Sequence, residues 1–201
     1  MTNWRLHRAY YEAQGQLCLA TSNSTEALEI VTMMLKAIKG KTCSLPVKKL
    51  ICEKLAQMIS TRANFQARQQ IHKVTLTVLA SSRSSQQRQA FLFYLECLLP
   101  LISSAHFNQV YAEVFLEFRE EPVSQVLIQW VKLFPAVRLR VSDQRMADRL
   151  ELLLRNLHTK YSKLQKSTLI LATLEEISER IRSEGFLAEC RDFIQNRNPA
   201  I

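Results

Sequence analysis

Glycine is scarce in this chain, with 3 residues among 201, or about 1.5% against a usual ~7%. Phosphate-binding loops and dinucleotide fingerprints need glycine where the backbone approaches the ligand. Tight β-hairpin turns need it where φ is positive. The composition therefore excludes the familiar nucleotide-binding loops and disfavours a fold built on hairpins.

Metal and catalytic motifs are missing as well. No CxxC, CxxH or HExxH spacing occurs, and consecutive histidines lie at least 34 residues apart. Neither a structural zinc site nor a zinc-protease helix is therefore expected. We expect no metal, no cofactor, no small-molecule substrate and no enzymatic activity.

Cys43 is the strongest candidate for a nucleophile, because it precedes an expected helix start and is close in sequence to Lys41, Lys48 and Lys49. A helix N-terminus and neighbouring cations lower the pKa of a thiol. A packing role is the more common alternative, since buried cysteine behaves as a small apolar side chain. The cysteines are odd in number and scattered, which is typical of a reducing compartment rather than a disulfide framework.

Long hydrophobic runs are lacking too. The longest, residues 90–102, spans 13 positions and contains Glu96, whereas a membrane-spanning helix needs about 20 apolar residues. The first residues lack the apolar core of a signal peptide. We therefore expect a cytoplasmic or nuclear chain with no membrane span.

What the chain does contain is helical periodicity. Apolar residues recur at spacings of three and four along most of its length, which predicts an all-α fold of about nine or ten helices. Asn23 and Asp143 stand where N-caps are expected, and Gly40 and Gly185 where helices are expected to end. Only residues 136–141 alternate in the manner of a strand, and there we expect an extended connector.

The apolar segments begin at intervals of mostly 18 to 23 residues, so that pairs of helices repeat about every 40 residues. This period is typical of HEAT- or armadillo-like helical arrays, although an irregular α-bundle has a similar spacing. No linker interrupts the chain. We expect a single all-helical domain over residues 1–201.

Positive charge is concentrated in one half of the chain. Residues 1–100 carry 13 basic and 5 acidic side chains, whereas residues 101–201 carry 14 and 13. Between residues 36 and 90 the only carboxylate is Glu53. The basic side chains between residues 36 and 90 are candidates for contact with nucleic acid or an acidic partner, or else they form a solvated surface. The basic side chains of this segment are Lys36, Lys39, Lys41, Lys48, Lys49, Lys54, Arg62, Arg68, Lys73, Arg83 and Arg88.

Within this set, Lys48, Lys49 and Lys54 are expected to share the solvent face of one helix with Glu53 and Gln57. Reversing the charge of the three lysines is then expected to abolish nucleic-acid binding without unfolding the chain.

Aromatic residues form a second candidate surface. Segments 91–95 and 114–118 leave little polar face on a helix, and such helices are buried on both sides. They form either the central layer of the fold or an interface with a helix of a partner. The candidate interface residues are Phe91, Phe93, Tyr94, Phe115 and Phe118.

Together these patterns favour a non-enzymatic helical scaffold or adaptor that binds another protein, as a subunit of a larger intracellular complex. The alternative is an accessory protein that binds DNA or RNA through a basic ridge over residues 36–90.

Overall fold

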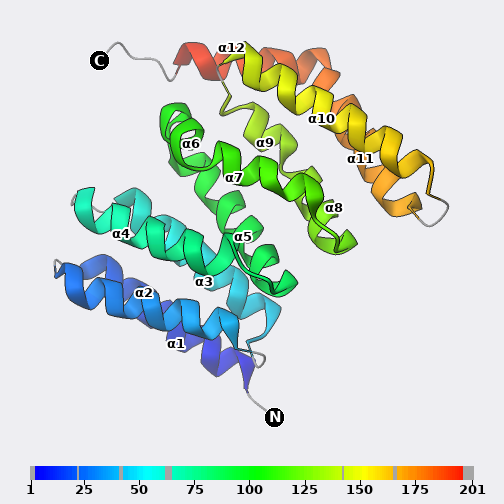
Figure 1. Cartoon of the computed structure of the whole chain (residues 1–201). Coiled ribbons are helices and arrows are strands. Elements are labelled where there is room, and N and C mark those ends of the chain that lie inside the picture. The colour runs from blue at the N-terminus through cyan, green and yellow to red at the C-terminus, as the bar shows by residue number, and fades with distance from the viewer. Residues whose placement is uncertain are drawn as a thin grey trace. The chain divides into compact units, whose positions relative to one another are not determined.

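The computed structural model describes residues 3–21, 23–40, 43–61, 65–141, 143–164 and 167–196 (Figure 1). These residues form twelve α-helices and three short turns of 3-10 or π helix, and none of them lies in a β-strand. The chain divides into two compact units, Met1–Ile102 and Ser103–Ile201, and each is described by itself. The single domain expected over residues 1–201 stays a prediction.

Unit 1 contains two rows of helices. One row is formed by α1, α3 and α5, with α3 packed between the other two; in the second row α2 packs against α4. Helix α2 also packs against α1. The elements are α1 (Trp4–Ala20), α2 (Ser24–Lys39), α3 (Leu45–Thr61), α4 (Phe65–Thr75), the π-helical η1 (Leu76–Ala80), α5 (Ser85–Leu98) and the 3-10 turn η2 (Leu99–Leu101).

Unit 2 is organised around α11, which packs against α8, α9, α10 and α12. Its aromatic core joins Trp130 to Phe115 and Phe134, whose ring centroids lie 5.3 and 5.0 Å from that of Trp130. The elements are α6 (Ser104–Val110), α7 (Ala112–Glu117), the 3-10 turn η3 (Phe118–Glu120), α8 (Ser124–Lys132), α9 (Phe134–Arg138), α10 (Gln144–Ser162), α11 (Thr168–Arg182) and α12 (Glu184–Asn196).

Helix starts follow the local sequence closely. The side chains of Asn23 and Asp143 accept hydrogen bonds from the backbone N–H groups of Thr25 and Arg145, which confirms both predicted N-caps. Gly40 caps the end of α2, as predicted. Gly185 does not end α11, which stops at Arg182; it lies instead in the first turn of α12.

Two other expectations are corrected. The described residues contain more helices than nine or ten, because a break at Tyr111 separates α6 from α7 and the additional helix α9 forms where a connector is expected. Residues 136–141 are not an extended connector: the short helix α9 starts at Phe134, with Pro135 in its first turn, and a turn follows the helix. Phe134 and Val137, three residues apart in α9, are both buried, and a helix brings residues at that spacing to the same face.

None of the described helices combines the length and the apolar character that crossing a membrane would require.

Candidate functional site

Helix α1 meets the core of unit 1 through a glycine. Gly15 and Cys18 are its buried residues, and Gly15 faces the side chain of Lys54 on α3. A Cβ atom built on Gly15 would lie 2.7 Å from Cγ of Lys54 and 2.8 Å from its Cδ. The absence of a side chain at Gly15 therefore lets α1 approach α3 closely.

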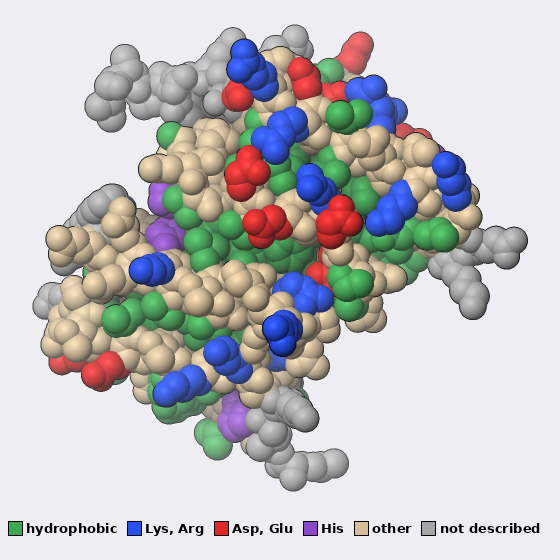
Figure 2. Space-filling view, in the orientation of Figure 1, with side chains coloured by type: hydrophobic (Ala, Val, Ile, Leu, Met, Phe, Trp, Pro, Cys, Tyr) green, Lys and Arg blue, Asp and Glu red, His purple; other side chains and the backbone are tan. Residues whose placement is uncertain are grey.

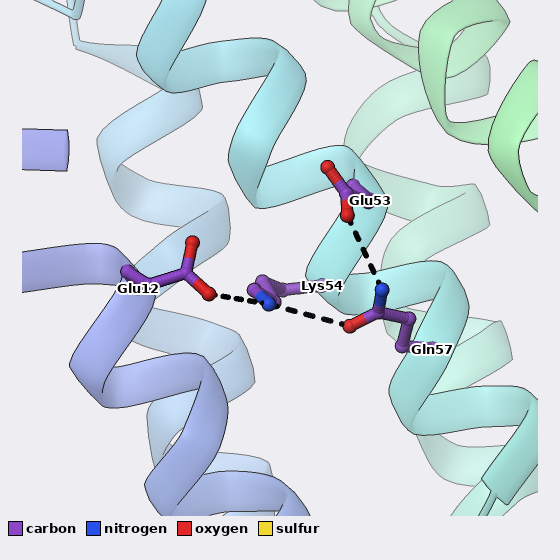
Figure 3. Close-up of polar contacts among 4 residues, drawn as sticks. All are labelled: Glu12, Glu53, Lys54 and Gln57. Atoms are coloured by element: carbon purple, nitrogen blue, oxygen red, sulfur yellow. Dashed lines mark hydrogen bonds and ion pairs between the residues drawn. The ribbon is translucent and has the colours of Figure 1, made fainter. Parts of the chain in front are cut away.

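Lys54 is buried in this contact and its ammonium group is paired (Figure 3). Its Nζ lies 2.6 Å from Oε1 of Glu12 on α1, and it donates to Oε1 of Gln57, 3.4 Å away. The amide of Gln57 in turn donates to Oε1 of Glu53. Lys54 is thus a structural link between α1 and α3.

The Lys54 contact also affects Glu12. The hydrogen bond from the ammonium group of Lys54 lowers the pKa of the Glu12 carboxyl below its ordinary value, with a smaller contribution from the positive charge itself. Burial acts in the opposite direction but is outweighed. Glu12 is therefore held in its ionised form, which is the form that pairs with Lys54.

The opposite face of α1 is apolar and exposed. The side chains of Leu6, Tyr10 and Leu17 are 67%, 47% and 56% exposed, and Ala13 and Ala20 are exposed with them. The intervals between these five residues are four, three, four and three, which is the heptad spacing of a coiled-coil seam. We call these five residues the α1 seam.

The positions beside the α1 seam hold no Lys, Arg, Asp or Glu. They are occupied by His7, Ala9, Gln14, Gln16 and Thr21. All the charged residues of α1 (Arg5, Arg8 and Glu12) lie outside the seam and its flanks. The seam is therefore an uncharged strip on a strongly basic unit.

One edge of the α1 seam joins α2. The hydroxyl group of Tyr10 donates to Sδ of Met33, 3.3 Å away. Met33 lines a shallow groove along α2, together with Thr25, Leu28, Glu29, Thr32 and Lys36. The apolar strip on α1 thus has a neighbouring depression on α2.

The predicted basic residues do not form one exposed set. Lys48 and Lys54 are buried, so the expectation that they face solvent is wrong. Helix α3 is packed on two sides: Lys54 reaches Glu12 of α1, and Lys48 donates to Oε1 of Gln86 on α5. Lys41 and Arg62 lie outside the described residues.

The remaining basic residues of the segment differ in exposure. Arg68 and Arg88 are half-buried, and Arg88 donates to the carbonyl oxygens of Ser82 and Arg83 in the turn before α5. The exposed ones are Lys36, Lys39, Lys49, Lys73 and Arg83. On the face drawn in Figure 2, the basic side chains of unit 1 mostly stand apart from acidic ones, whereas the two signs are interspersed over unit 2.

The charge division coincides with the structural one. Unit 1, which ends at Ile102, carries 13 basic and 5 acidic residues and so a net charge of +8; unit 2 carries 14 and 13, and so +1. The positive charge of the chain is thus a property of unit 1.

The predicted aromatic interface lies mostly inside the units. Phe91, Tyr94, Phe115 and Phe118 are all buried, which favours the central-layer alternative for them. Phe93 is half-buried, and Nζ of Lys49 lies 4.8 Å from its ring centroid. A role of these five residues in binding a partner stays a prediction, for which Phe93 is the accessible member.

Cys43 lacks the environment of a reactive thiol. Burial raises its pKa above the ordinary value and outweighs the opposing effect of Lys48. Burial also raises the pKa of Cys97, to about 11. Among the described residues, no group of three or more His, Cys, Asp or Glu side chains is arranged to hold a metal ion.

Unit 2 has a groove of its own between α10 and α11. There Nε2 of His158 lies 3.5 Å from Oε1 of Glu175. The groove has side chains of both signs, and its lining residues are Leu154, Arg155, His158, Thr159, Glu175, Ser178, Glu179 and Arg182. This mixture gives the groove no single chemical preference.

No protein-family model, curated protein or solved structure matches the chain.

Proposed function

We propose that this chain is a non-enzymatic helical scaffold or adaptor, a subunit of a larger intracellular complex, that binds another protein through the outer face of α1. The observation that carries the proposal is the α1 seam, where Leu6, Tyr10 and Leu17 are each about half exposed or more. Contiguous apolar surface on a soluble domain marks interaction sites. An amphipathic helix presents such anchors to a partner at i, i+4, i+7 and i+11.

The packing within unit 1 supports a HEAT- or armadillo-like arrangement as part of this proposal. Helix α3 packs against α1 and α5, and α2 packs against α4, so that helices two places apart in the chain are neighbours. Stacked helical hairpins have this pattern, and they form extended surfaces that hold other proteins.

A cytoplasmic or nuclear location also belongs to the proposal. All five cysteines are free thiols, and free thiols persist where the surroundings are reducing. The non-enzymatic role is supported by the raised pKa of Cys43, the nucleophile candidate.

The test is capture of partners by the purified chain from a cell extract, with three baits: the unaltered chain, Leu17→Glu and Leu152→Glu. Leu152 is 54% exposed on α10 and Leu17 is 56% exposed on α1, so the two substitutions are matched in chemistry and exposure. We expect at least one protein to be captured by the unaltered chain and by Leu152→Glu but not by Leu17→Glu. Calorimetric titration of the recovered protein with the purified chain then confirms direct binding. A partner set unaffected by Leu17→Glu would contradict the proposal.

Binding of nucleic acid is a second candidate function, favoured by the net charge of +8 on unit 1 and its five exposed basic side chains. Neutralised phosphates release counterions, so such binding depends steeply on salt. Its test is the neutralisation of exposed basic residues of unit 1.

A further inference from the structure

The heptad spacing of the α1 seam raises the question of which helix covers it. We infer that α1 pairs with α1 of a second copy of this chain, antiparallel and about a two-fold axis. The inference rests on the proposed function, because it takes the same face of α1 as the binding surface and names its occupant.

The order of side-chain sizes along the seam is self-complementary. When the two-fold axis passes between Tyr11 and Glu12, Leu6 faces Leu17 of the second copy and Tyr10 faces Ala13. The largest seam residue thus meets one of the smallest, and the pairing gives four apolar layers. A two-fold interface uses one patch twice, so the patch must complement itself in this way.

The two-fold axis also lies near the middle of α1. Helix α1 runs from Trp4 to Ala20, so the axis falls near its middle and the whole helix is available for pairing. In an antiparallel pair, an a residue of one helix faces a d residue of the other. Tyr10 and Leu17 stand at a positions of the seam. Leu6 and Ala13 stand at d positions, so each facing pair joins an a residue to a d residue.

The absence of Lys, Arg, Asp and Glu beside the seam favours a second copy over an acidic partner. An acidic helix would be held by Lys or Arg at the flanking positions, as e and g residues do in coiled coils. None of the 13 basic residues of unit 1 occupies such a position. Two copies of α1 therefore bring no Lys or Arg of α1 together along the seam, although the chain as a whole carries +9.

The pairing should be weak and should strengthen with salt. A 17-residue helix is about 25 Å long, and two such helices form a small interface, for which we expect a dissociation constant on the order of 1–100 µM. Salt screens the repulsion between the two positively charged chains. Binding to nucleic acid or to an acidic protein has the opposite dependence on salt.

Sedimentation equilibrium of the purified full chain, from about 5 to about 500 µM and at about 50 and 500 mM salt, tests the inference. We expect a monomer–dimer equilibrium that is tighter at the higher salt. Leu6→Glu and Leu17→Glu should each weaken it at least about tenfold, while Leu152→Glu leaves it unchanged. A chain that is monomeric throughout, or a dimer that survives Leu17→Glu, would overturn the inference.

A second experiment tests the pairing of large with small seam residues without introducing charge. Tyr10→Ala alone places alanine against alanine in both central layers, and Ala13→Tyr alone places tyrosine against tyrosine. A mixture of the two variants restores one tyrosine against one alanine in each layer. We expect the mixture to associate at least about tenfold more tightly than either variant alone; equal association would overturn the pairing of large with small residues.

Failure of this inference is distinct from failure of the proposed function. A monomeric chain that still captures a partner lost by Leu17→Glu would overturn self-pairing and leave the scaffold proposal standing. A monomeric chain whose captured proteins are all insensitive to Leu17→Glu would overturn both.

Discussion

The side chain of Lys54 occupies the space that a side chain on Gly15 would need. A Cβ atom at Gly15 would lie 2.7 Å from Cγ of Lys54, and the ammonium group at the end of the same lysine is 2.6 Å from Glu12. The aliphatic stem of Lys54 thus packs α3 against α1 while its charged end ties the two helices together. This contact buries one face of α1 and leaves the α1 seam on the outside.

The first prediction concerns Gly15. Gly15→Ala removes the helix penalty of glycine, worth about 1 kcal/mol, but places Cβ against the stem of Lys54, and overpacking of this kind costs about 1–3 kcal/mol. We expect a net loss of about 1 kcal/mol in the free energy of unfolding, measured by urea titration.

Gly185→Ala is the matched control. Gly185 also lies in a helix, but nothing approaches within 4 Å of a Cβ atom built there. Only the gain in helix propensity remains, so we expect stabilisation by about 0.5–1 kcal/mol. If the two substitutions change the urea midpoint in the same direction, the packing argument at Gly15 is incorrect.

The second prediction concerns the pairing of Glu12 with Lys54. Glu12→Gln leaves the buried ammonium group of Lys54 without its carboxylate. We expect the free energy of unfolding to fall by about 1–2 kcal/mol at neutral pH. This is less than the ~3–5 kcal/mol lost when one partner of a fully buried pair is removed, because the side chain of Glu12 is 43% exposed. A double-mutant cycle with Lys54→Met isolates the pair. A coupling energy near zero would contradict the pairing.

The third prediction is the pH dependence of that effect. The pKa of Glu12 is lower in the folded chain than its ordinary 4.5 because of Lys54, so near pH 4 the unfolded chain binds more protons at this position. The contribution of Glu12 is therefore complete above the ordinary pKa and is lost as pH falls below about 4.5 through the folded pKa. We expect the stability difference between the unaltered chain and Glu12→Gln to shrink in that range, as followed by urea titrations from pH 7 downward. A difference that stays constant would show that the carboxylate charge is not involved.

The fourth prediction separates the buried basic residues from the exposed ones. Reversal of Lys48, Lys49 and Lys54 to Glu should unfold unit 1 rather than leave the fold intact. Lys48 and Lys54 are buried, and buried charges without partners cost several kcal/mol. Neutralising Lys49, Lys73 and Arg83 to Gln should leave the circular dichroism and the urea midpoint nearly unchanged, because all three are exposed.

The same exposed variant tests binding of nucleic acid. If Lys49, Lys73 and Arg83 neutralise phosphates, their replacement should weaken binding of a duplex oligonucleotide. The dependence of log K on log salt concentration should then become shallower by about 1 for each phosphate that is no longer neutralised. Binding that is unaffected by the triple substitution would exclude these residues as the binding surface.

The fifth prediction concerns the cysteines of unit 1. Burial raises the pKa values of Cys43, Cys52 and Cys97, and the thiolate is the reactive form. We expect all three to be alkylated by iodoacetamide at pH 8 more slowly than free cysteine, and at the free rate in denaturant. Rapid alkylation of Cys43 in the folded chain would restore it as a candidate nucleophile.

Several features of the fold were predictable from neighbouring residues alone. Helical periodicity and N-caps are local properties, because a helix face and a cap are set by residues within four positions of each other. Asn23 and Asp143 are identifiable for this reason. The end of α9 within residues 136–141 is not identifiable in this way, because these six residues alternate as in a strand. The two buried residues Phe134 and Val137 have the helical spacing of three, but Phe134 lies outside the alternating stretch.

The candidate site was less accessible to such reasoning. Leu6, Tyr10, Ala13 and Leu17 have a readable heptad spacing, but Cys18 and Leu19 of α1 are apolar too, so the sequence does not decide which face is buried. Packing of Gly15 against Lys54 decides it. Likewise, a lysine on a helix is expected to face solvent, and only the packing of α3 between α1 and α5 places Lys48 and Lys54 inside.

The amino-acid sequence alone determines the scarcity of glycine, the helical periodicity and the accumulation of positive charge before residue 100. Each of these features depends only on composition or on residues a few positions apart. Which helix is enclosed by two others is decided by contacts between residues far apart in the chain, such as Glu12 with Lys54 and Lys48 with Gln86. Those contacts withdraw two lysines from the basic surface and turn the α1 seam outward, because a helix can bury only the faces that its neighbours cover.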